Sequence, residues 1–125
     1  MLGQRDAVAN IAVKDLDRAR VFYEETLGLK KIATMSEQVM GFASGSTRIN
    51  VYRSQFAGTN KATAVTWNVG DEIESLVREL KKRGVVFEHY DIPGATPVGD
   101  VYVTGEIKVA WFKDPDGNIL NLINQ

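Results

Sequence analysis

The stretch Val13–Leu29, VKDLDRARVFYEETLGL, contains the start, the body and the end of one helix. Asp15 or Asp17 can cap its first turn, because a short acidic side chain accepts hydrogen bonds from the first backbone N–H groups. Apolar residues then recur at helical spacing, at Leu16, Ala19, Tyr23 and Leu27. Gly28 follows as a C-terminal cap. The short β-branched run Ala7–Val13 before the helix is typical of a strand, so the pattern predicts a strand that leads directly into an amphipathic helix.

The same pattern starts again in the second half of the chain. Residues 62–69 are strand-like, and a helical apolar stripe follows at Ile73, Leu76, Val77 and Leu80. A shift of 56 positions places Asp71 on Asp15 and Gly84 on Gly28 without a gap. Strand-like stretches follow both helices, at 29–35, 38–43, 47–53, 85–92, 107–112 and 118–123, with 101–104 as a further candidate. The order βαβββ, linker, βαβββ predicts an α+β fold in one domain, 1–125, with two modules at about 1–55 and 62–125. The polar residues 54–61 would join them.

Composition narrows the possible chemistry. The chain has 125 residues, no cysteine and one histidine, His89. These counts exclude disulfides, thiolate zinc sites, cysteine nucleophiles and any site within one chain that needs two imidazoles. The formal net charge of −1 gives no basic surface for nucleic acid. No apolar run approaches the roughly 20 residues needed to cross a bilayer, and no secretory signal is recognisable. We therefore expect a cytoplasmic protein without a nucleic-acid or membrane partner.

A second phrase, Phe112–Asn118 or FKDPDGN, contains a Pro-Asp-Gly turn. Together with Val13–Leu29 it closely resembles the vicinal oxygen chelate superfamily, which includes glyoxalase I, bleomycin-resistance proteins, fosfomycin-resistance transferases and extradiol dioxygenases. The resemblance covers essentially the whole chain. It implies two βαβββ modules that form a cup-shaped mixed β-sheet with helices on the outer face, and it implies a homodimer. We interpret both phrases as structural, a helix packing against the core and a turn, rather than as catalytic motifs.

The resemblance also implies where a metal would be held. In this family one ligand on the first strand of each module lies seven residues before the helix-opening Asp, which selects Val8 and Ala64. The ligand of the last strand lies four residues after the turn glycine, at Asn121, and a looser match selects Asn50. None of these side chains offers the imidazole, carboxylate or thiolate that divalent transition metals prefer. We therefore predict no metal and no cofactor.

Strand alternation predicts what lines the cup instead, because residues two apart share a face. The predicted ligand-binding residues are amides, a hydroxyl, two aromatic rings and one cation, namely Asn10, Arg48, Asn50, Tyr52, Thr66, Asn68, Trp111 and Asn121. Such a lining suits a flat or partly polar organic molecule. The alternative is that the amides only satisfy neighbouring backbone groups and that Arg48 forms a surface ion pair. Residues 91–106 are predicted to form a flap that would bring Val98, Val101 and Tyr102 to the ligand.

These expectations favour a metal-free small-molecule-binding protein of the sequestration or resistance type. One alternative is a metal-independent lyase or isomerase that uses His89 or Tyr52 for proton transfer. Another is a metal-dependent glyoxalase or dioxygenase, which the side chains at the four ligand positions disfavour. A third is a structural or regulatory module that senses a ligand.

Overall fold

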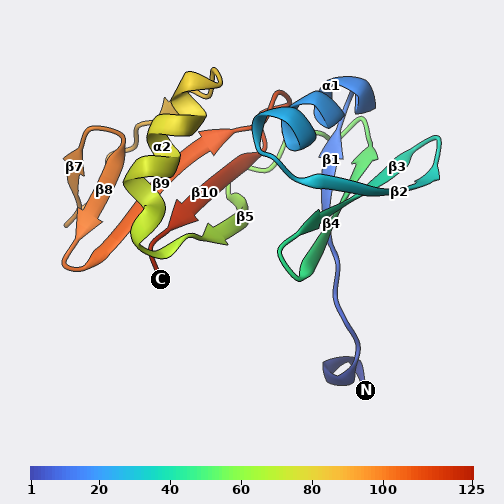
Figure 1. Ribbon diagram of the computed structural model, residues 1–125, viewed down its shortest axis with the longest axis horizontal. Coiled ribbons are helices and arrows are strands. Elements are labelled where there is room, and N and C mark those ends of the chain that lie inside the picture. Colours follow the sequence, from blue (N-terminus) through green and yellow to red (C-terminus); the bar gives the residue numbers. More distant parts are fainter. The chain divides into compact units, whose positions relative to one another are not determined.

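The computed structural model describes residues 1–125 apart from the side chain of Met35. The chain divides into an N-terminal unit, Met1–Thr59, and a C-terminal unit, Asn60–Gln125. Each unit holds one mixed sheet with a helix on one face (Figure 1). The predicted α+β class and the strand–helix–strands order of each half are confirmed.

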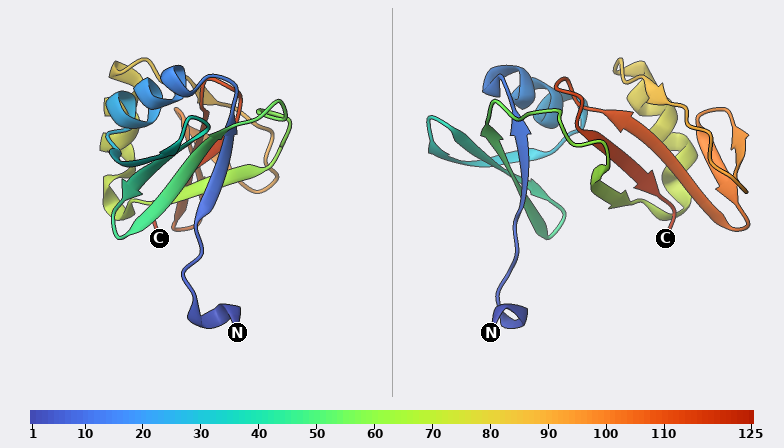
Figure 2. Two further views of the ribbon diagram at one scale, coloured as in Figure 1. Left: turned by 90° about the vertical axis from the view of Figure 1, so that its right-hand side faces the viewer. Right: turned by 180° about the vertical axis from the view of Figure 1, so that it is seen from behind.

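The N-terminal unit has the order βαβββ. Its elements are β1 (Ala9–Val13), α1 (Leu16–Arg20), a π-helical turn (Val21–Thr26), β2 (Lys30–Ser36), β3 (Val39–Ser44) and β4 (Thr47–Arg53). The sheet order is β1-β4-β3-β2, with β1 parallel to β4 and the other pairs antiparallel. The residues before β1 are all exposed and lead away from the sheet of this unit (Figure 2).

Local chemistry sets the bounds of the first helix. The Asp15 side chain accepts a hydrogen bond of 3.1 Å from the Arg18 backbone N–H, which confirms one of the two predicted caps. Gly28 has a φ of +79°, a conformation that a residue with a Cβ adopts at a cost, and it ends the helical segment. The helix covers a core formed by Ile11, Val13, Ala19, Tyr23, Phe42, Ile49 and Val51, all of which are buried.

The C-terminal unit repeats the order and adds a hairpin. Its elements are β5 (Thr63–Asn68), α2 (Ile73–Lys82), β6 (Phe87–Glu88), β7 (Thr96–Val98), β8 (Val101–Thr104), β9 (Ile107–Lys113) and β10 (Ile119–Ile123). The sheet order is β5-β10-β9-β8-β7, and β6 also pairs with β9. Helix α2 lies across this sheet (Figure 1). The core contains Ile73, Val77, Leu80, Phe87, Ala110, Phe112, Leu120 and Leu122. No helix in the described residues is long and apolar enough to cross a membrane.

Two details of the second half differ from the prediction. The strand expected at 85–92 is reduced to Phe87–Glu88, and the segment expected to be a flap contains the antiparallel hairpin of β7 and β8. Val101 and Tyr102 are buried within this unit, while Val98 is 62% exposed. The candidate strand 101–104 is present as β8 and pairs with β9. Strand β7 was not foreseen, because Gly and Pro residues lie in and around it.

The turn between β9 and β10 is built around one buried carboxylate. Asp114, only 4% exposed, accepts hydrogen bonds at Oδ1 from the backbone N–H groups of Asp116 and Asn118, at 3.0 and 2.9 Å. Its Oδ2 accepts a third from the Asn118 side-chain amide at 2.8 Å. The carboxylate therefore stabilises the turn, as the structural interpretation of this phrase predicted.

We expect Asp114→Ala to lower the free energy of unfolding by about 2–3 kcal/mol, because it leaves buried donors without partners. Urea unfolding followed by the fluorescence of the two tryptophans measures this loss. The exposed Asp91→Ala is the matched control and should change stability by less than about 0.5 kcal/mol. Equal effects of the two substitutions would contradict the structural role.

Candidate functional site

The open face of the N-terminal unit is the sheet face away from α1. Asn10 on β1 lies beside Asn50 on β4, and Asn50 lies beside Gly41 on β3. Their neighbours along the strands, Ile11 and Val51, are buried on the helix side. Alternation therefore leaves the row Asn10–Asn50–Gly41 on the open face, together with the predicted residues two positions away, Arg48 and Tyr52.

Arg48 is fixed on this face by two neighbours. Its Nε donates a hydrogen bond of 3.0 Å to Oδ1 of Asn50. Its guanidinium group lies against Gly41, where an added Cβ would be 2.7 Å from Nη2. Tyr52 is 36% exposed on the same face. Asn10 donates to the carbonyl of Val8 at 3.3 Å, so its amide serves the local backbone, as the alternative interpretation allowed.

The open face of the C-terminal unit contains the corresponding row. Thr66 on β5 lies beside Asn121 on β10, which lies beside Trp111 on β9. Asn121 is 8% exposed, and its Oδ1 has no hydrogen-bond partner in the described part of the chain. A buried amide oxygen without a partner costs free energy. Asn68 is exposed at the end of the same face, beside Ile123.

Two tyrosine rings contact the indole ring of Trp111. Tyr90 and Tyr102 meet it edge to face, with ring centroids at 5.7 and 5.6 Å. The indole N–H donates to the hydroxyl oxygen of Thr63 at 3.2 Å. Burial raises the pKa of the Tyr90 hydroxyl above its ordinary value. A largely apolar cavity of about 300 Å³ lies here, lined by Lys61, Ala62, Thr63, Tyr90, Ile92, Trp111 and Ile119.

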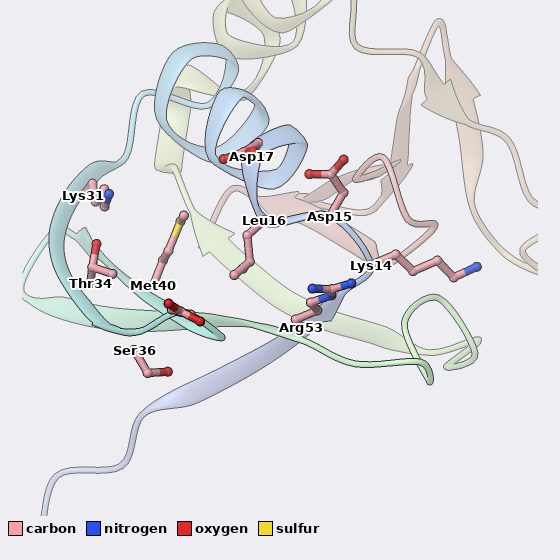
Figure 3. A pocket seen from close by; sticks show the side chains of 10 residues that line it. Lys14, Asp15, Leu16, Asp17, Lys31, Thr34, Ser36, Met40 and Arg53 are labelled. Carbon is pink, nitrogen blue, oxygen red and sulfur yellow. The ribbon is translucent and has the colours of Figure 1, made fainter.

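Two further cavities belong to the N-terminal unit. One, of about 540 Å³, lies on the open face and is lined by Asp6, Ala7, Val8, Ile32, Ala43, Gly45, Ser46, Thr47 and Arg48. The other, of about 560 Å³, lies by the start of α1, where Leu16 and Met40 lie between Lys31 and Arg53 (Figure 3). That second cavity is on the helix side and holds none of the predicted ligand-binding residues.

The residues at the family's metal positions do not fit a divalent ion. The side chains of Val8 and Ala64 have no atom that could bind a metal. The side-chain oxygen of Asn50 already accepts a hydrogen bond from the cationic Arg48. A metal ion at Asn50 would meet a positive charge at hydrogen-bonding distance, and none of the four family positions carries a carboxylate. Among the described residues, no cluster of three or more His, Cys, Asp or Glu side chains could hold a metal.

His89 belongs to an ion cluster at the end of α2. Its Nε2 lies 2.9 Å from Oδ1 of Asp100, and Oδ2 of Asp100 lies 2.7 Å from Nζ of Lys81. His89 lines none of the three cavities described above. These contacts favour a structural role for the single histidine.

The sequence interpretation missed three residues of these faces, Gly41, Thr63 and Tyr90. Gly41 carried a signal, because a glycine inside a strand often marks a close approach of another group. Thr63 faces the open side through an irregularity in the pairing of β5 with β10, between Ile119 and Leu120, which simple alternation does not foresee.

The fold and the two open faces define a protein of paired βαβββ modules. Residues 6–122 match the glyoxalase/bleomycin resistance protein/dioxygenase superfamily, and the chain belongs to that superfamily. It is 27% identical over 119 residues to the virulence protein STM3117 of Salmonella typhimurium, covering 90% of this chain and 78% of that protein.

Solved structures share the fold. The fosfomycin resistance protein FosX of Listeria monocytogenes matches with a TM-score of 0.72 at 17% identity, covering 95% of this chain and 91% of that one. Lactoylglutathione lyase of Agrobacterium tumefaciens matches with a TM-score of 0.70 at 17% identity, covering 95% and 92%. An integron cassette protein from the Halifax Harbour sewage outfall matches with a TM-score of 0.72 at 21% identity, covering 94% and 96%.

We expect Asn121→Leu to raise the free energy of unfolding by about 1 kcal/mol, because it replaces an unpartnered buried amide with an apolar group of similar size. Thermal and urea unfolding test this. The reverse exchange at the adjacent core position, Leu120→Asn, should lower stability by about 3 kcal/mol. A destabilised Asn121→Leu variant would mean that the amide is satisfied in the folded protein.

The Asp100 cluster predicts a pH dependence of stability. The hydrogen bond from Lys81 lowers the pKa of Asp100, burial opposes the shift, and the contact with His89 adds to it. A carboxyl whose pKa is lower in the folded than in the unfolded protein stabilises the fold above about pH 5, and this contribution is lost as the pH falls through the folded pKa.

Asp100→Asn should therefore lower stability by up to about 1 kcal/mol at pH 7, and the difference from the parent should shrink below about pH 4. Asp91→Asn, at an exposed position, is the control. A difference that did not depend on pH would contradict this role for the carboxylate.

Proposed function

We propose that this superfamily member binds a small organic molecule on the open faces of its modules and does so without a divalent metal. Its role would be to hold or sequester the ligand. The observation that carries the proposal is the set of side chains at the family's four ligand positions, Val8, Asn50, Ala64 and Asn121. Two cannot bind a metal at all, and Asn50 is engaged by a cation.

The open faces favour a ligand that is partly apolar and partly hydrogen-bonding. The C-terminal face offers the aromatic wall of Trp111 and Tyr90 over a cavity of about 300 Å³. Buried in the same face is the unpartnered oxygen of Asn121, an acceptor whose burial costs stability. Retaining such a group is understandable if binding uses it, either after a modest rearrangement of Trp111 or through a water molecule.

One protein that shares this fold has been solved with a bound metal. A FosX variant from Listeria monocytogenes has been solved with manganese(II) and dihydroxypropylphosphonic acid. Its sequence identity with this chain is 16%, so the similarity supports a shared fold and does not support a shared chemistry. The side chains at the four ligand positions of this chain support the metal-free alternative.

Metal analysis and ligand screening together test the proposal. Protein purified without chelators should contain well under one divalent ion per chain, and added Mn²⁺, Zn²⁺ or Ni²⁺ should bind no more tightly than to Asn121→Leu. A fragment screen by ¹H–¹⁵N NMR should shift the Trp111 indole and Asn121 side-chain signals, and EDTA should leave the shifts unchanged. One tightly bound ion per chain, or binding that EDTA abolishes, would overturn the proposal.

We also propose that the chain forms a homodimer, as the resemblance implied. In support, β1 and β5 each stand at an end of their sheets, where a strand has unpaired backbone groups on one side. Folded proteins usually cover or protect such edges. Light scattering after gel filtration should give twice the chain mass of 13.8 kDa, and a single-chain mass at micromolar concentration would contradict the dimer.

A further inference from the structure

Gly41 and Arg48 form a fitted pair on the open face of the N-terminal unit. An added Cβ at Gly41 would lie 2.7 Å from Nη2 of Arg48 and 3.0 Å from both Cζ and Nε. These separations are too short for any other residue unless the guanidinium moves. Gly41 is buried and has no positive φ, so its backbone conformation does not demand glycine. The glycine is explained by the close approach of Arg48.

Asn50 further restricts the conformation of the Arg48 side chain. Its Oδ1 accepts the hydrogen bond from Arg48 Nε at 3.0 Å, and the guanidinium lies close to the backbone at Gly41. Ordering a long arginine side chain costs conformational entropy. A guanidinium ordered in advance loses less of that freedom when it binds an oxyanion.

The cavity beside Arg48 has the chemistry of a site with one charged end. Its walls include exposed apolar side chains, since Val8 is 38% and Ile32 is 46% exposed, and Ala43 adds to them. Asp6, from the exposed segment before β1, is the other charged residue in the lining. The cavity volume of about 540 Å³ is in the range of small-molecule sites.

We infer that this open face recognises the carboxylate of an organic ligand through Arg48, with the apolar part of the ligand against Val8 and Ile32. This inference rests on the proposed function and gives the ligand a chemical class, an organic anion. The guanidinium matches a carboxylate in charge and in planar geometry. Gly41 is a positioning residue, because the absence of a side chain lets the guanidinium lie close to the backbone of β3.

The corresponding row of the C-terminal unit has different side chains. There Trp111 lies beside Asn121 on β10, as Gly41 lies beside Asn50 on β4. The two open faces therefore differ in chemistry: that of the N-terminal unit presents a cation, and that of the C-terminal unit presents an aromatic wall.

Benzoate and benzamide are the probes, because they have nearly the same shape and differ in charge. In ¹H–¹⁵N NMR titrations of the full chain, benzoate should shift the Gly41 amide, the Asn50 side-chain amide and the Arg48 Nε–H signals. It should bind at least about tenfold more tightly than benzamide. Arg48→Gln should weaken benzoate binding about tenfold or more and leave benzamide unchanged. Asp6→Asn, which removes a like charge from the cavity, should strengthen benzoate binding up to about threefold.

Two further variants separate position from charge. Gly41→Ala keeps the guanidinium and displaces it, so it should weaken benzoate binding toward the level of Arg48→Gln. Arg53→Gln removes the same charge from the helix side of the same strand and should leave benzoate binding within about twofold. ¹H–¹⁵N spectra of each variant check that the fold is retained.

The results separate the inference from the proposed function. Equal affinity for benzoate and benzamide, no loss in Arg48→Gln, or an equal loss in Arg53→Gln overturns the inference. So does the absence of any benzoate-induced shift on this face up to the solubility limit. The proposed function stands in each of these cases if the fragment screen still finds metal-independent ligands at Trp111 and Asn121, and it fails on its own if no fragment binds either open face.

Discussion

Both sheets depend on one packing constraint, a phenylalanine on β3 and another on β9 that must be buried in the core of their unit. Phe42 on β3 meets Tyr23, and Phe112 on β9 meets Trp67 and Phe87; Phe42, Phe112 and Tyr23 are fully buried. Because side chains alternate along a strand, burying these rings sends their neighbours, Gly41 and Trp111, to the opposite side. Packing in the core therefore determines which residues the open faces present. A one-residue slip of either strand would exchange the two sets.

The residues of the open faces can vary because they are not part of the hydrophobic core. The asparagines at related positions, Asn50 and Asn121, illustrate this freedom. Asn50 holds a guanidinium in a cavity that remains open, whereas Asn121 is covered and leaves its oxygen without a partner. Their neighbours on the adjacent strand differ, since Gly41 lies beside Asn50 and Trp111 lies beside Asn121. Related backbones thus provide two chemically different surfaces.

Much of the fold could be predicted from the sequence because its signals are local. Helix caps at Asp15 and Gly28, apolar periodicity and the 114–117 turn each act within a few residues, and each placed its element within a few positions. Strand β7 was missed because it is short and depends on its pairing with β8, whereas the candidate strand 101–104 matches β8. Alternation along β4 predicted that Asn50 and Arg48 share a face, and their side chains are joined by a hydrogen bond. It could not reveal that Gly41 seats the guanidinium or that Tyr90 folds against Trp111, since both contacts depend on side-chain conformations across strands.

The hydrogen bond between Arg48 and Asn50 also limits how this chain could change over evolutionary time. A carboxylate introduced at position 50 would pair first with the adjacent guanidinium, so it would be neutralised before any cation could reach it. Arg48 would have to be lost earlier, and only then would the space above Gly41 admit a larger residue. The order of substitutions matters at this site, and the shortest path toward a metal ligand at position 50 begins with a change at a different residue.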